Sequence, residues 1–295
     1  MVEILDIDQK MGKKVLILSG RGKLPLLFRE LSLKHGYQPI TVGVKTITDF
    51  KTDYTVPFMG FVEFEQLVEK LGNPPIVLLG KFDPRLSTAL FDSFIQKLRF
   101  KLFGGNYKRN QEILNTLRSR IKNTLPGEVI RGFIDYYEGK GFRFLPSEEI
   151  KKILSPLLAD EGLLTPSVKI EKELLEEGKR FLSYTQKLAD MEIGQVLVFK
   201  NGSVFAVESV EGTDETIKRG AKLTGRGFSV TKAARSEQDF RIDIPAVGGQ
   251  TLKLLKKFGA KALFLESGKV LILERERFLK EAERAGIAVI GLTLR

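Results

Sequence analysis

The stretch VLILSGRGKLP, residues 15–25, joins a short apolar run to a glycine turn. The run Val15–Ser19 has the length of a buried strand, and Gly20-Arg21-Gly22 ends it. Leucines then recur with helical spacing as far as Gly36, and Pro39–Val44 forms a second apolar run. A strand, a glycine turn, a helix and another strand in this order predict a parallel sheet with helices on its faces.

The same alternation continues beyond this unit, and a different pattern follows in the second half. Asn201-Gly202 suits a tight type I′ turn, so residues 195–200 and 203–209 are predicted to form a β-hairpin. Ser267-Gly268 is predicted to be the turn between two further strands. The other expected strands are 75–79, 142–145, 229–232, 240–244, 262–265, 270–273 and 287–290, and the other expected helices are 86–99, 111–123, 129–137, 169–190, 213–223, 249–258 and 275–285.

These elements predict an α/β protein of two domains. Residues 11–158 are expected to be a Rossmann-like parallel-sheet domain that carries the glycine turn, and 159–168 a linker. Residues 169–295 are expected to be a mixed α/β domain that closes with the first on a shared cleft. The length of 295 residues, with 42% hydrophobic and 29% charged residues, agrees with two globular domains.

Composition excludes several classes of protein. No apolar stretch reaches the ~20 residues of a membrane span, and no secretory signal opens the chain, so a soluble intracellular protein is expected. The absence of Cys and the single histidine, His35, exclude disulfides, cysteine nucleophiles and multi-histidine zinc sites. Hydrolysis would therefore depend on carboxylates, Lys or Arg, backbone donors and an ion such as Mg²⁺. The net charge of +11 favours an anionic partner.

The glycine turn is the first candidate site. Gly20, Arg21, Gly22, Lys23 and Leu24 lie where a strand leads into a helix, a place that exposes backbone N–H groups to a phosphate. The pattern matches neither the Gly-x-Gly-x-x-Gly fingerprint nor a P-loop. Phosphate binding and a plain tight turn therefore both remain open.

A second candidate is Glu211-Gly212-Thr213-Asp214, which lies between the hairpin and a predicted helix. A carboxylate, a glycine and a hydroxyl at a helix N-terminus could hold an anionic group or an ion. The residues alone favour the simpler interpretation, in which Thr213 or Asp214 caps the helix and Glu211 is solvated.

The third candidate is the segment QDFRIDIP, residues 238–245. In a strand, Asp239, Arg241 and Asp243 would share one face, where acids could hold Mg²⁺ and arginine could bind phosphate. An exposed face crossed by salt bridges is the alternative. Lys232, on the neighbouring predicted strand, could join the same site.

Residues 97–122 form a basic stretch with interleaved aromatic side chains and the single acid Glu112. Such a stretch could contact anionic lipid headgroups or, less readily, nucleic acid. A solvated surface is the alternative interpretation.

These motifs together resemble the UDP-2,3-diacylglucosamine pyrophosphatases of the LpxI type. The resemblance covers nearly the whole chain beyond Gly12 and rests on five stretches: residues 16–25, 79–81, 157–164, 204–214 and 238–248. Two departures stand out. Arg21 replaces the middle one of three glycines, and Gly104-Gly105-Asn106 replaces an acidic Gly-Asp-Asp.

The resemblance implies a Mg²⁺-dependent hydrolase of lipid A biosynthesis. It would cleave UDP-2,3-diacylglucosamine to UMP and 2,3-diacylglucosamine 1-phosphate (lipid X) by attack of water on the α-phosphorus. Asp239 is the expected catalytic aspartate, with Asp243 as the next candidate, and both are candidate metal ligands. Arg241 and Lys232 would stabilise the phosphoryl charge.

The remaining expectations concern substrate and partners. Glu211, Thr213 and Asp214 would assist at the same end of the substrate, and the glycine turn with Lys81 would bind the other end. The enzyme would work at the inner face of the cytoplasmic membrane without nucleic acid, and a homodimer stays open. The alternatives are a non-catalytic sugar-nucleotide or lipid-binding protein and, more weakly, an RNA-binding protein.

Overall fold

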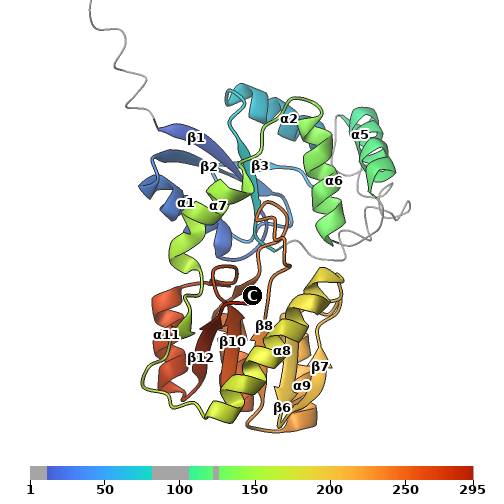
Figure 1. Cartoon of the computed structure of the whole chain (residues 1–295). Helices are drawn as coiled ribbons and strands as arrows, with labels where there is room; N and C mark the ends of the chain where they lie inside the picture. The colour runs from blue at the N-terminus through green and yellow to red at the C-terminus, as the bar shows by residue number, and fades with distance from the viewer. Residues whose placement is uncertain (1–11, 82–105, 122–125, 295) are drawn as a thin grey trace, which may run out of the picture. The chain divides into compact units, whose positions relative to one another are not determined.

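The computed structural model describes residues 12–81, 106–121 and 126–294, which form two compact units (Figure 1). The first unit runs to Ile153 and also includes Phe240–Ile242, and the second comprises Leu154–Asp239 and Asp243 onward. The mixed α/β class expected from the sequence is confirmed. The predicted helix at 86–99, the first part of the basic stretch and Gly104-Gly105 lie outside the described residues.

The sheet of the first unit is entirely parallel. Its strands are β1 (Lys13–Ser19), β2 (Tyr37–Val44), β3 (Tyr54–Val56) and β4 (Ile76–Leu79), in the order β3-β2-β1-β4. A parallel sheet is covered on both faces, which explains why the central strands are continuous apolar runs. Residues 15–17 are completely buried. The chain leaves β1 toward β2 on one side and later returns to β4 on the other, so the strand order reverses at β1.

Helices cover this sheet. They are α1 (Leu24–Lys34), α2 (Phe61–Lys70), α5 (Tyr107–Arg120), α6 (Pro126–Glu138) and α7 (Ser147–Leu154). Side chains of β1, α2, α5 and α6 share one apolar core, which Ile242 joins. The strand predicted at 142–145 is wrong: only Phe144 forms a bridge, to Ile76, because the loop touches the edge of β4 at a single residue.

The second unit has a six-stranded mixed sheet in the order β5-β12-β10-β8-β6-β7. Strands β8 (Ser229–Lys232), β10 (Ala262–Glu266) and β12 (Ala288–Leu292) are parallel to one another. Strands β6 (Val196–Lys200) and β7 (Ser203–Val207) form the predicted hairpin, and Asn201 and Gly202 both have the positive φ that a type I′ turn requires. Strand β5 (Gly162–Leu163) pairs with β12.

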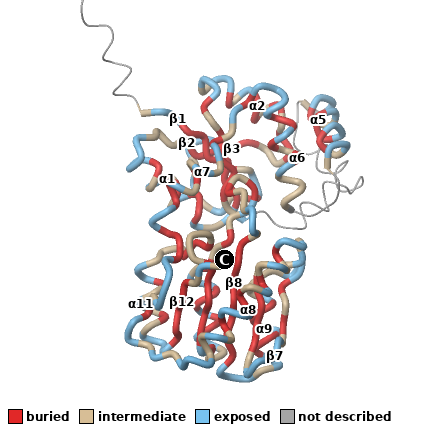
Figure 2. Tube along the Cα trace, viewed as in Figure 1, coloured by how far each residue is buried: buried red, intermediate tan, exposed pale blue. Residues whose placement is uncertain are grey.

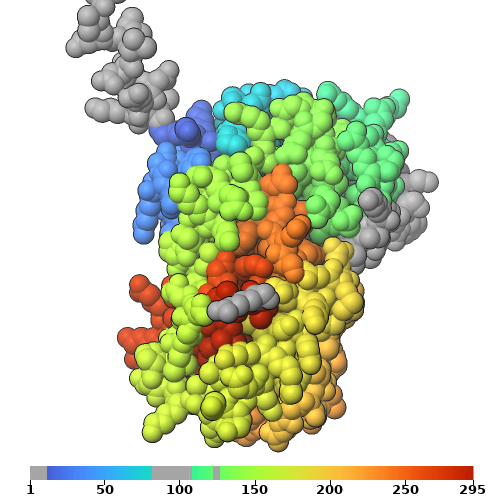
Figure 3. Space-filling view, in the orientation of Figure 1, coloured from blue at the N-terminus to red at the C-terminus, as the bar shows by residue number. Residues whose placement is uncertain are grey.

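Two apolar layers enclose this sheet, whose central strands are buried (Figure 2). Alternate strand residues such as Phe199 and Phe264 pack with α8 (Lys172–Asp190) on one face. Their neighbours, such as Val198 and Leu263, pack on the other face with α9 (Thr213–Thr224), α10 (Gly249–Phe258) and α11 (Arg275–Arg284). Helix α8 forms part of the outer surface of this unit, shown in yellow in Figure 3. This two-residue period is the one expected of buried mixed strands.

One predicted pairing in this unit is wrong. The strands on either side of Ser267-Gly268 do not form a hairpin. Both edges of β10 are already occupied by β8 and β12, so β11 (Leu271–Ile272) pairs instead with β9 (Ala246–Val247) in a separate two-stranded sheet.

The segment 159–168 lies within the second unit. Ala159 and Thr165 are completely buried, and the hydroxyl of Thr165 accepts the N–H of Val289 at 2.9 Å. Gly162 pairs with Gly291 in the sheet, where a Cβ on Gly291 would lie 1.7 Å from the carbonyl oxygen of Asp160. Gly162 and Leu163 therefore form one edge of the sheet, as strand β5.

Candidate functional site

The glycine turn of the first unit meets the loop that follows β4. The N–H of Arg21 donates to the carbonyl of Lys81 at 3.0 Å, and the N–H of Lys81 donates back at 2.9 Å. Gly20 sits in this contact, and a Cβ there would lie 2.7 Å from the Lys81 carbonyl oxygen. The structure therefore brings together the predicted loop and Lys81, at the point of strand-order reversal where α/β sheets commonly bind ligands.

Two polar groups of the glycine turn are engaged within the unit. The N–H of Gly22 donates to Asp49 Oδ1 at 3.0 Å, and Arg21 Nε donates to the carbonyl of Ile47 at 3.0 Å. Arg21, which replaces a glycine of the family, thus ties the turn to a neighbouring loop. Lys23 and Lys81 are both exposed at this edge.

In the second unit, a nearly buried lysine lies at the carboxyl end of β8. Lys232 is 5% exposed, and its Nζ donates to Thr213 Oγ1 at 2.9 Å. Thr213 Oγ1 in turn donates to Glu208 Oε1 at 2.9 Å, and Glu208 Oε2 accepts the N–H of Gln195 at 2.9 Å. A charge withdrawn from water is costly without compensation, so this ammonium is well placed to attract an anion.

These residues gather at one edge of the sheet. Strand β6 begins beside the end of β8, with Val196 opposite Lys232, and β7 ends just before Glu208. Thr213 is the first residue of α9. The carboxyl ends of parallel strands share an edge, which explains how Lys232 and Thr213, both predicted to bind substrate, come together.

Asp243 belongs to the same electrostatic environment. The residue is open to solvent, yet desolvation by neighbouring protein atoms raises the pKa of its carboxyl. The charges of Lys232 and Arg235 oppose this rise, and the charge of Glu208 adds to it. Glu208 and Arg235 were not singled out from the sequence, because nothing in the local pattern separates them from other charged residues.

The strand predicted at 240–244 is wrong, and with it the shared face of Asp239, Arg241 and Asp243. Residues 240–242 form a turn. Phe240 and Ile242, 2% and 6% exposed, are counted with the first unit, whereas both aspartates belong to the second. The alternation of apolar and charged residues that suggests a strand arises here because the apolar side chains are buried in the first unit.

Gln238 holds the base of this turn. Its Nε2 donates to the carbonyl of Asp239 at 3.2 Å and also to the carbonyl of Asp243. Its Oε1 accepts the N–H of Arg235 at 3.3 Å. One side chain therefore keeps the backbones of the two candidate aspartates close together. The sequence motif included Gln238, but the strand interpretation gave it no role.

Arg241 belongs to the first unit, whereas Asp239 and Asp243 belong to the second. Its guanidinium pairs with Glu138 of α6 at 3.4 Å, and both side chains are partly exposed. Phe240 beside it donates its N–H to Ser147 Oγ at 2.9 Å. Arg241 thus has a contact within the first unit.

The other predicted residues of the α9 N-terminus have local partners. Glu211 Oε1 accepts Arg219 at 2.6 Å and Thr216 Oγ1 at 3.2 Å. Desolvation raises the pKa of Glu211, but these hydrogen bonds and the charge of Arg219 outweigh it, so the pKa is lowered. Asp214 Oδ1 accepts the hydroxyl of Thr251 at 3.3 Å.

The predicted helix cap is also wrong. The N-cap residue is Gly212, and the hydroxyl of Thr213 bonds Glu208 and Lys232 instead.

The carboxylates of Asp239 and Asp243 could supply only one or two protein ligands to a metal ion. Within residues 12–81, 106–121 and 126–294, no three His, Cys, Asp or Glu side chains gather as a metal-binding group. Mg²⁺ is commonly held by one or two carboxylates, with waters and substrate phosphates as the other ligands. Asp239 and Asp243, whose backbone carbonyls both accept from Gln238, are two carboxylates of the number that such a site needs.

Comparison with known proteins finds a match in the second half of the chain. Residues 160–290 match the family model described as the LpxI C-terminal domain. This part of the chain is similar to that domain. It contains Lys232, Thr213, Glu208 and the turn held by Gln238.

A longer match supports the same family. The chain is 27% identical over 189 residues to the UDP-2,3-diacylglucosamine pyrophosphatase LpxI of Caulobacter vibrioides. The match covers 61% of this chain and 66% of that relative, just under two thirds of its length. Together with the LpxI C-terminal domain, it confirms the resemblance to LpxI-type proteins drawn from the sequence. None of the helices that the structure describes is long and apolar enough to cross a membrane.

Proposed function

We propose that this protein hydrolyses the pyrophosphate bond of UDP-2,3-diacylglucosamine, giving UMP and 2,3-diacylglucosamine 1-phosphate in lipid A biosynthesis. The family comparison supports the substrate class. The observation that carries the chemistry is the nearly buried Lys232 ammonium, whose charge acts on the carboxyl of Asp243. A pyrophosphate is an anion whose cleavage needs charge neutralisation and an activated water.

The proposed step uses a water molecule, Asp239, Lys232 and Thr213. Water attacks the α-phosphorus, Asp239 orients it and takes its proton, and the bond from that phosphorus to the bridging oxygen breaks. The leaving group is the sugar 1-phosphate, and UMP retains the new oxygen. Lys232 neutralises charge that builds on the phosphoryl oxygens, and Thr213 fixes the direction of its ammonium.

Asp239 and Asp243 are the residues proposed to hold Mg²⁺. The ion, when bound, supplies positive charge at the phosphate oxygens. Arg241 is a further candidate for contact with phosphate, on the basis of the family motif. Glu211 and Asp214 have only a secondary place in this proposal, because each is engaged with a neighbouring side chain.

The glycine turn and Lys81 are proposed to bind the other end of the same substrate. The position at the reversal of strand order and the two exposed lysines support this assignment. The Rossmann-like character of this unit and the closure of the two units on one lipid are parts of the proposal. So is action at the inner membrane surface, where a substrate with two acyl chains would reside.

The test is a radiolabelled assay with the full chain and UDP-2,3-diacylglucosamine. Wild-type protein with Mg²⁺ should release UMP and lipid X, and EDTA should stop the release. Asp239→Asn should lower kcat by at least ~10³-fold, as expected for loss of a group that activates the nucleophile. The matched control is Glu237→Gln, the same carboxylate-to-amide change at an exposed neighbour in the same loop.

Each outcome has a distinct meaning. No turnover but tight substrate binding would overturn the hydrolase in favour of a sugar-nucleotide or lipid-binding protein. Full turnover by Asp239→Asn would keep the reaction and discard the assignment of this residue. Turnover that survives EDTA would remove the metal from the proposal.

A further inference from the structure

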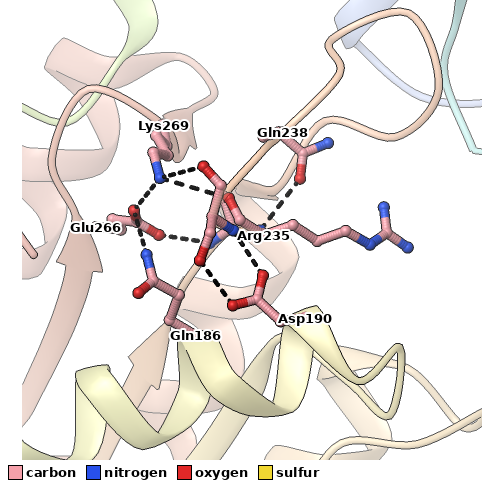
Figure 4. Close-up of polar contacts among 8 residues, drawn as sticks. Gln186, Asp190, Arg235, Gln238, Glu266 and Lys269 are labelled. Carbon is pink, nitrogen blue, oxygen red and sulfur yellow. Dashed lines mark hydrogen bonds and ion pairs between the residues drawn. The ribbon is translucent and has the colours of Figure 1, made fainter.

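The segment Ala234–Ser236 connects the end of β8 to the loop that carries Asp239. It belongs to neither a helix nor a strand, and Ala234 is completely buried. Buried backbone N–H and C=O groups outside regular structure need other partners. Here side chains from α8, from β10 and from the turn after β10 provide them (Figure 4).

Glu266 is the centre of this cluster. It is the last residue of β10 and is 2% exposed. Its Oε2 accepts the N–H of Ala234 at 2.8 Å, and its Oε1 pairs with Lys269 Nζ at 2.8 Å. Gln186 of α8 donates to the same Oε1 at 3.0 Å. Both carboxylate oxygens are therefore engaged, one of them directly with the backbone of the connecting segment.

Lys269 and Asp190 hold the next two residues. Lys269 Nζ donates to the carbonyls of Ser236 at 3.1 Å and Arg235 at 3.4 Å. Asp190 accepts both the N–H of Ser236, at 2.7 Å, and its hydroxyl, at 2.6 Å. Asp190 is the last residue of α8, where a negative charge interacts unfavourably with the helix dipole. Its position thus serves the loop rather than the helix.

We infer that Glu266, acting with Lys269, is a positioning residue that fixes the loop from Ala234 to Asp239 and thereby places Asp239 for reaction. The inference rests on the proposed function. A buried ion pair is weak evidence of a contribution to stability, since apolar replacements often do as well. The Glu266–Lys269 pair instead binds three backbone groups that lie three to five residues before Asp239. The same segment donates the Arg235 N–H to Gln238, which binds the carbonyls of Asp239 and Asp243.

The first experiment compares Glu266→Gln with wild type. The amide can still accept the Ala234 N–H, but the ion pair with Lys269 is lost. We expect kcat to fall roughly 10- to 100-fold with KM nearly unchanged, because small misplacements of a catalytic group carry such costs. Hydrogen–deuterium exchange should accelerate in peptides covering 234–239, a readout that needs no activity.

A double-variant cycle separates positioning from general weakening. Lys269→Met alone should lower kcat to a similar extent, and the double variant should be no worse than either single one, because the two residues act as one unit. The control is Lys261→Met, which removes the exposed pair with Glu171 (2.7 Å) in the same unit and should leave kcat unchanged. If Glu266→Gln does not fold, Lys269→Met and Lys269→Arg supply the comparison, with recovery of kcat expected for arginine.

The results distinguish this inference from the proposed function. A wild-type protein without turnover would refute the function, and unchanged exchange at 234–239 in the variants would refute positioning independently. An active wild type with an inactive Asp239→Asn but a fully active Glu266→Gln would overturn the positioning role alone. Losses of kcat that simply multiply in the double variant would also overturn it.

Discussion

Lys232 occupies a position where a lysine does little for stability. It is 5% exposed on the last residue of a buried strand, and its hydrogen bond is to a hydroxyl rather than a carboxylate. Met has a similar length and removes the buried charge while leaving the Thr213–Glu208 bond in place.

We therefore expect Lys232→Met to lower kcat by about 10²–10³-fold, as for a lost donor to a developing oxyanion. The free energy of unfolding should change little, because the charge that no longer has to be buried offsets the lost attraction to the carboxyl of Asp243. Urea denaturation and the radiolabelled assay measure the two quantities. Activity within threefold of wild type would contradict the role given to this lysine.

Glu211 gives a pH-dependent prediction at the same scale. Its pKa is lowered in the folded protein, so its contribution to stability is fully present above the ordinary value of about 4.3 and is lost as the pH falls through the folded-state pKa. Glu211→Gln should therefore cost up to about 1 kcal/mol at pH 7 and less at pH 3. Denaturation at both pH values measures the loss of stability.

Glu215→Gln, which breaks the more exposed pair with Lys218, is the control and should cost less. An equal loss at both pH values would contradict the assignment.

The turn 240–242 is the element whose behaviour departs most from its sequence pattern. Ile242 is 6% exposed and packs in the core that β1, α2 and α6 also share, although the residues before and after the turn belong to the second unit. A substitution in the turn should therefore weaken the first unit.

Ile242→Ala should lower the free energy of unfolding by about 2–4 kcal/mol, the usual cost of truncating a buried aliphatic side chain. Exchange should accelerate in peptides from β1 and α2. Val210→Ala, at an 84% exposed apolar residue, is the control and should change stability by less than about 0.5 kcal/mol. Faster exchange confined to residues 154–239 would show that the turn does not support the first unit.

At the scale of the whole molecule, the net charge of +11 bears on the proposed site of action. Positive charge attracts a protein to anionic bilayers by an interaction that salt screens. We expect the full chain to sediment with vesicles containing phosphatidylglycerol at 20 mM salt, and to be largely released at 500 mM. Pure phosphatidylcholine vesicles should bind little. Equal binding to both vesicle types at either salt concentration would show that charge does not direct the protein to membranes.

Features that depend on neighbouring residues could be predicted from the sequence. The apolar run and glycines of 15–25 predicted β1, its turn and α1, and Asn201-Gly202 predicted the hairpin, because strand length, helical period and positive φ are local properties. Lys232 and Thr213 could each be placed as well, because the pattern predicts a strand that ends at Lys232 and a helix that begins at Thr213.

Contacts between residues that are far apart in the chain depend on how the whole chain folds. It joins Glu208, Thr213 and Lys232 through hydrogen bonds and assigns Phe240–Ile242 to the first unit. It also engages both oxygens of Glu266 with partners from other segments. Alternating apolar and charged residues fit a strand or a turn whose apolar side chains are buried elsewhere, and the choice depends on burial by residues far away in the chain. Strand order and the satisfaction of buried polar groups are long-range properties, so no local period could have revealed them.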